Sequence, residues 1–140
     1  CDQYFTMVYG TIDTASGQGA LCQAGHPYPI ILRNGATLSE IGHGGYPVGM
    51  LPEVRFEDVV FTLGPGERLV IYSDGVPDVA DERGQRFGPA RLREALLAQP
   101  AADVATTLSR LETQLNEWRG SRAWEDDASI MVLARQPETN

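Results

Sequence analysis

Apolar residues in the first half of the chain form short runs bounded by turn-forming residues, a pattern typical of β-strands. It predicts strands over six segments: 5–12, 20–24, 29–33, 37–41, 56–63 and 68–73. The first two are joined by a turn-rich segment and read as a hairpin. Asn34-Gly35, between the third and fourth, is a dipeptide typical of tight hairpin turns. The fifth and sixth are separated by Gly64-Pro65-Gly66, which cannot continue a strand.

The spacing of apolar residues changes in the second half to the intervals of three and four that amphipathic helices show. It predicts helices over 89–98 and 102–118, separated by Pro100, and a final buried strand over 128–134. Many antiparallel strands followed by helices and a returning strand indicate an α+β fold, with helices packed on antiparallel sheet.

Composition and charge narrow the function classes. The 140 residues are 42% hydrophobic and 21% charged, as expected for one globular domain. The net charge of −8 predicts no binding to nucleic acid, whose phosphates it would repel, and none to membrane surfaces. Apolar runs are too short to cross a bilayer. Two cysteines without zinc-site spacing indicate a reducing, cytoplasmic location.

Two acidic positions stand out beside the predicted strands. Asp74 ends the strand that begins at Arg68 and is followed by Gly75, while Asp126 and Asp127 precede the last strand. If these two strands are antiparallel neighbours, Asp74 and Asp126 meet at one edge of the sheet. Clustered carboxylates there favour hard cations such as Mg²⁺ or Mn²⁺. Taken alone, however, an Asp-Gly after a strand is usually an ordinary turn, and paired aspartates before a strand more often mark a loop or cap.

A set of ordered segments changes this balance: FTMVYGTID (5–13), AGHPYP (24–29), GYPVG (45–49), PGERLVIYSDGV (65–76), FG (87–88) and DDASI (126–130). In these segments the chain resembles the SpoIIE/RsbU-type phosphatases of the PPM superfamily. The resemblance runs from residue 5 to residue 133. Tyr28 stands where the family usually has proline, and Val48 where it has leucine.

The resemblance implies an antiparallel β-sandwich flanked by helices, with two Mn²⁺ or Mg²⁺ ions that activate water to hydrolyse phosphoserine or phosphothreonine. Carried over by position, Asp74 and Asp126 would be metal ligands. Asp127 would support them, and Gly75 would allow the tight turn beside the metal. All 140 residues would belong to this one domain.

One family motif has no counterpart in the chain: the D-x-S-G-H-G segment whose aspartate bridges both metals. Residues 42–45 contain Gly-His-Gly, but no aspartate precedes them at the needed spacing. The chain also begins within a strand-like run, so we expect a fragment of the domain. Alone it should bind metal poorly and be weakly active or inactive. Its unpaired sheet edges could be covered in a homodimer.

The resemblance also implies partners. The substrate would be a phosphorylated anti-anti-sigma-like (STAS) protein, and the parent chain would carry an N-terminal sensor or receiver region. The alternative is a phosphatase-fold module without catalytic activity that binds a signalling partner. Retention of Asp74 and Asp126 favours the enzyme, whereas absence of the opening motif favours the module.

Overall fold

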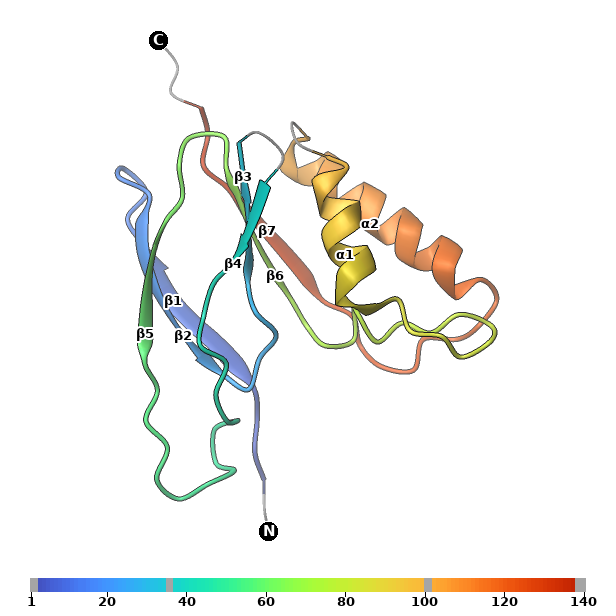
Figure 1. Ribbon diagram of the computed structural model, residues 1–140, viewed down its shortest axis with the longest axis horizontal. Coiled ribbons are helices and arrows are strands. Elements are labelled where there is room, and N and C mark those ends of the chain that lie inside the picture. Colours follow the sequence, from blue (N-terminus) through green and yellow to red (C-terminus); the bar gives the residue numbers. More distant parts are fainter. Residues whose placement is uncertain (1–2, 35–36, 100–101, 138–140) are drawn as a thin grey trace.

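Two antiparallel sheets and a pair of helices form three layers in the computed structural model, which describes residues 3–34, 37–99 and 102–137 (Figure 1). The outer sheet has the strand order β1-β2-β5 and the middle sheet the order β4-β3-β6-β7. The elements are β1 (Met7–Ile12), β2 (Gln18–Ala24), β3 (Ile30–Arg33), β4 (Thr37–Glu40), β5 (Asp58–Thr62), β6 (Arg68–Tyr72), α1 (Gly88–Leu97), α2 (Val104–Arg119) and β7 (Ile130–Ala134).

This arrangement confirms the α+β class and the antiparallel sandwich flanked by helices. β1 and β2 pair as the expected hairpin, and β3 and β4 also pair antiparallel. Asp13 orders the first turn because its Oδ1 accepts hydrogen bonds from the backbone and the hydroxyl of Ser16, at 2.6 and 2.9 Å. These bonds hold the pKa of Asp13 below its ordinary value. Gly35 and Pro100 lie outside the described residues.

The two central strands of the middle sheet are buried on both faces, which explains why their sequences are continuously apolar. Side chains alternate along a strand, so Ile30 and Val70 pack toward the helices while Ile31 and Leu69 pack toward the outer sheet. Burying each such side chain contributes roughly 1.5–3 kcal/mol. The middle sheet is therefore the layer that joins the two hydrophobic cores.

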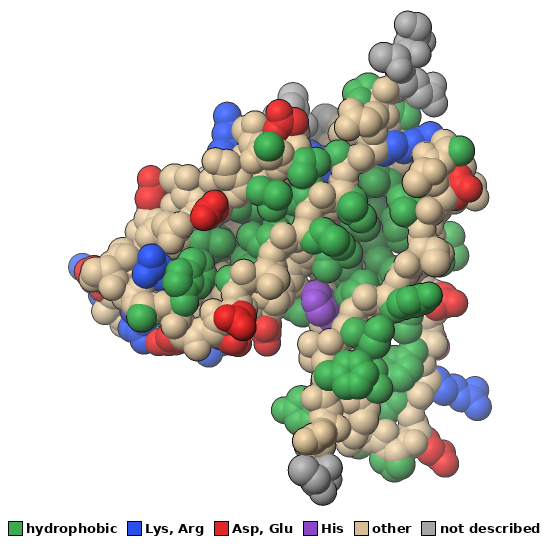
Figure 2. Space-filling model, turned by 180° about the vertical axis from the view of Figure 1, so that it is seen from behind, with side chains coloured by type: hydrophobic (Ala, Val, Ile, Leu, Met, Phe, Trp, Pro, Cys, Tyr) green, Lys and Arg blue, Asp and Glu red, His purple; other side chains and the backbone are tan. Residues whose placement is uncertain are grey.

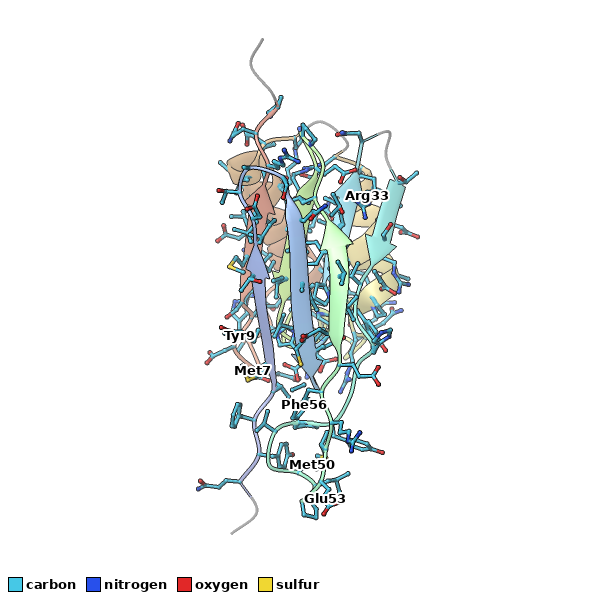
Figure 3. All side chains as sticks on the ribbon, turned by 90° about the vertical axis from the view of Figure 1, so that its left-hand side faces the viewer. Met7, Tyr9, Arg33, Met50, Glu53 and Phe56 are labelled. Atoms are coloured by element: carbon cyan, nitrogen blue, oxygen red, sulfur yellow. The ribbon has the colours of Figure 1, made fainter. Side chains whose placement is uncertain are left out.

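The sandwich is open along one side, where β1 and β7 are the edge strands of their sheets. Ile12 and Leu133 line a groove of about 490 Å³ there, and hydrophobic side chains gather where the sheets meet (Figure 2). Beyond the strand ends of the outer sheet, the loop that carries Met50 and Phe56 projects away from the sandwich (Figure 3). No helix in the described part of the chain is long and apolar enough to span a membrane.

A buried arginine fastens the helices to the middle sheet. Arg68 at the start of β6 is only 3% exposed. Its guanidinium donates to the Thr107 hydroxyl of α2 at 2.6 Å and to the carbonyl of Gln99, after α1, at 2.5 Å. Burial lowers the pKa of Arg68 from its ordinary value. Because a buried charge without acceptors is costly, these bonds set how the helix pair sits on β6.

Replacing the buried acceptor should therefore destabilise the fold. We expect Thr107→Val to lower the free energy of unfolding by about 1–3 kcal/mol, because it removes an acceptor from a buried guanidinium without changing side-chain shape. Thr113→Val is the matched control. The Thr113 hydroxyl donates to the carbonyl of Ser109, four residues earlier, and is exposed rather than buried. Urea denaturation checks both, and equal losses in the two variants would contradict the role given to Arg68.

Candidate functional site

The pairing of β6 with β7 places the predicted acidic residues at one end of the middle sheet. Tyr72, the last residue of β6, is the partner of Ile130, the first residue of β7. Asp74 therefore leaves the sheet where the segment with Asp126 and Asp127 enters it. All three aspartate side chains are exposed. We call this end of the sheet the acidic edge.

Ser73 ties the two acid-bearing segments together. Its backbone N–H donates to the carbonyl of Ser129 at 2.9 Å, and its Oγ accepts from the Ser129 N–H, also at 2.9 Å. The same hydroxyl donates to the carbonyl of Asp127 at 3.3 Å. Ser73 is not among the predicted site residues, although it directly precedes Asp74. The backbone of the acidic edge is thus held by side-chain as well as main-chain bonds.

Gly75 is needed for space at this edge. It is buried, and a Cβ built on it would overlap the carbonyl oxygen of Asp127 and lie 2.9 Å from the carbonyl carbon. Its φ is not among the positive values that favour glycine elsewhere in the chain. The turn after β6 therefore requires glycine because the segment before β7 passes directly against it.

The donor chemistry of the edge fits a hard divalent cation, because Asp74, Asp126 and Asp127 offer carboxylate oxygens. One oxygen of Asp126 also accepts from the Asp127 N–H at 2.8 Å, and this orients that carboxylate. Within residues 3–34, 37–99 and 102–137, no group of three or more His, Cys, Asp or Glu side chains is placed to hold a metal ion. The described residues therefore do not form a complete metal site by themselves.

The turn that follows Asp74 is clamped to the end of α2. Glu82 accepts from the Ser121 hydroxyl at 2.7 Å and from its N–H at 3.2 Å, bonds that hold the pKa of Glu82 below its ordinary value. The Trp118 indole donates to the carbonyl of Gln85 at 3.1 Å. Both acid-bearing segments are consequently attached to the same helix end.

Comparison with known proteins identifies the family. A sequence model described as Stage II sporulation protein E (SpoIIE) matches residues 1–136. The chain belongs to the SpoIIE family. It is 33% identical over 129 residues to Protein IcfG of Synechocystis sp. (strain ATCC 27184 / PCC 6803 / Kazusa), and 24% identical over 131 residues to Phosphoserine phosphatase RsbP of Bacillus subtilis (strain 168).

The SpoIIE-family fold is also evident from solved structures. The phosphatase domain of the cell fate determinant SpoIIE from Bacillus subtilis, presoaked in Mn, superposes with a TM-score of 0.75 at 20% identity, over 96% of this chain and 58% of that one. The match with IcfG covers 92% of this chain and 20% of IcfG, and the match with RsbP covers 93% of this chain and 30% of RsbP. It therefore spans well under half of these curated SpoIIE-family relatives.

A substitution at the closest backbone approach tests the geometry of the acidic edge. We expect Gly75→Ala to cost about 1–3 kcal/mol of unfolding free energy, since the new methyl would meet backbone that cannot rotate away. Gly64→Ala is the control, because a Cβ there would lie 3.2 Å from a side chain, that of Glu67, rather than overlap the backbone. Thermal and urea unfolding measure both, and a Gly75→Ala protein as stable as the control would show that the segments are not packed this closely.

Proposed function

We propose that this chain is part of a metal-dependent protein serine/threonine phosphatase and supplies two carboxylate ligands, Asp74 and Asp126, to its metal centre. Membership of the SpoIIE family makes it a PPM-type phosphatase-family protein. The observation that carries the finer proposal is the β6–β7 register, which delivers both aspartates to one exposed edge. Their oxygens are of the type that Mn²⁺ and Mg²⁺ prefer.

Within this proposal each residue of the edge has a distinct task. Asp74 and Asp126 hold the cations, and Asp127 supports Asp126 through its N–H. Gly75 lets the two acid-bearing segments approach each other, while Ser73 fixes their relative position through its hydrogen bond to Ser129. Two bound divalent cations would supply Lewis-acid chemistry, lowering the pKa of water and neutralising charge on phosphoryl oxygens.

The other ligands are proposed to come from a D-x-S-G-H-G segment outside residues 1–140, because the described residues hold no complete donor set. The SpoIIE relative was presoaked in Mn, which supports a divalent-cation site of this kind. RsbP is named a phosphoserine phosphatase, which supports phosphoserine or phosphothreonine as the group attacked. We propose a phosphorylated anti-anti-sigma-like protein as substrate, and an N-terminal sensor or receiver region as regulator.

A second candidate is a phosphatase-fold module without catalytic activity that binds a signalling partner. The observation in its favour is the same incomplete donor set among the described residues. This candidate predicts that the protein binds its partner without releasing phosphate from the partner.

Neutralising either ligand separates the two candidates. In a protein that contains both this chain and the D-x-S-G-H-G segment, we expect Asp74→Asn and Asp126→Asn each to lower Mn²⁺-dependent phosphate release about 100-fold or more. An amide is a poor ligand, and even outer-shell changes cost about 10–100-fold. Isothermal titration should show weaker Mn²⁺ binding in both variants.

Asp103→Asn is the matched control for these variants. Asp103 caps α2 by accepting from Thr106 N–H at 2.7 Å, and asparagine caps helices about as well. Asp103 lies at the opposite end of α2 from the acidic edge, so the activity and Mn²⁺ binding of the Asp103→Asn variant should not change. Partner binding without phosphate release in the unmodified protein would support the non-catalytic module.

A further inference from the structure

A small pocket opens beside the acidic edge, between the end of α2 and the two acid-bearing segments. Its volume is about 110 Å³, and Gly75 and Asp126 form part of its wall. Sites for drug-sized ligands measure about 300–1,000 Å³, whereas one water occupies about 30 Å³. The pocket therefore has room for one short side chain rather than for a cofactor. Asp74 does not line it, so it lies to one side of the proposed metal centre.

One side of the pocket carries Arg119, a positive charge that forms no ion pair with any residue the structure describes. The guanidinium carbon of Arg119 lies over the Trp124 ring, 5.3 Å from its centroid. The guanidinium also donates to Asn116 Oδ1 at 3.2 Å and to the carbonyl of Arg122. None of these partners is a carboxylate, and its buried Nε has no acceptor among the described residues. The guanidinium is thus held in place by neutral groups among the described residues.

A second arginine in the pocket lining, Arg86, is largely exposed. The Arg86 side chain is 70% exposed and pairs with Asp78, itself 46% exposed, at 2.9 Å. Exposed ion pairs of this kind contribute little to stability, so a carboxylate from another molecule can replace Asp78 at little cost. Arginine suits this task because its planar guanidinium can bind a carboxylate through two parallel bonds.

We propose that this pocket binds an acidic side chain of the phosphoprotein substrate, within two residues of the phosphorylated serine or threonine. The inference rests on the proposed function, because it takes the phosphate to lie at Asp74 and Asp126. An extended substrate advances about 3.3–3.6 Å per residue, so its neighbouring side chains reach the space just past Asp126. Three carboxylates also line the pocket, and each has a partner: Asp78 pairs with Arg86, Glu125 pairs with Arg122, and Asp126 is taken to hold a cation. The charge of Arg119 therefore provides the local attraction for an anionic side chain.

A scan of phosphopeptides tests this specificity. The reference peptide carries glutamine at the two positions on each side of phosphoserine, and four further peptides each replace one glutamine by glutamate. We expect glutamate at one or two of these positions to raise kcat/KM about tenfold, an effect typical of hydrogen bonds to a charged group. Fluorescence anisotropy of labelled peptides that carry serine in place of phosphoserine, measured with Mn²⁺, should show the same preference in Kd and does not depend on turnover. Raising the salt concentration should weaken the preference.

A substitution in the pocket assigns the effect to it. In Arg86→Gln the preference for glutamate should fall to about threefold or less, while the Kd of the all-glutamine peptide changes little. Arg83→Gln is the matched control: Arg83 is an exposed arginine of the same turn that does not line the pocket. That variant should keep the tenfold preference.

The outcomes separate this inference from the proposed function. Equal Kd and kcat/KM for all five peptides in an active enzyme would overturn the inference and leave the phosphatase intact. A tenfold preference that survives Arg86→Gln would also overturn it. Absence of Mn²⁺-dependent hydrolysis of both the peptides and p-nitrophenyl phosphate would instead refute the proposed function, while the anisotropy series still decides whether the pocket binds an acidic side chain.

Discussion

The antiparallel pairing of β6 with β7 is the constraint on which the candidate site depends. Because Tyr72 pairs with Ile130, the end of one strand and the start of the other meet at the same end of the sheet. If these strands were parallel neighbours, Asp74 and Asp126 would lie at opposite ends of the sheet. The register itself follows from burial, since a slip of one residue would turn Val132 out of the core and expose it. The hydrophobic core thereby determines where the acidic residues lie.

The surroundings of the acidic edge combine rigidity with exposed charge. Ser73 and the close approach at Gly75 hold the two acid-bearing segments together, and Glu82 attaches them to the end of α2. The other end of that helix is fastened to β6 through Arg68 and Thr107. Helix, turn and strand end therefore form one connected support. Exposed carboxylates repel one another unless cations or arginines lie nearby, so such a support is useful where a metal is to bind.

Much of this architecture could be predicted from the sequence, for identifiable reasons. The two-faced burial of β3 and β6 produces apolar runs, and the helices show a clear change of period, so element types and approximate bounds were accessible. The strand order was not, because β5 and β6 follow one another in sequence yet lie in different sheets. The sequence also did not predict that Ser73 would hold the acidic edge together, or that Arg119 and Trp124 would line the pocket beside it. Both features depend on contacts between distant segments and leave no local pattern, although Ser73 adjoins Asp74. Roles for Asp74, Gly75, Asp126 and Asp127 as a metal site remain predictions.

The central claim is that Asp74 and Asp126 bind the same metal centre, and anomalous diffraction at the manganese edge tests it most directly. Crystals of a protein that contains this chain together with the D-x-S-G-H-G segment would be soaked in Mn²⁺. Our account predicts anomalous peaks within about 2.5 Å of carboxylate oxygens of both aspartates, a distance typical of oxygen ligands to divalent cations. Manganese bound elsewhere, or at one of the two aspartates without the other, would contradict it.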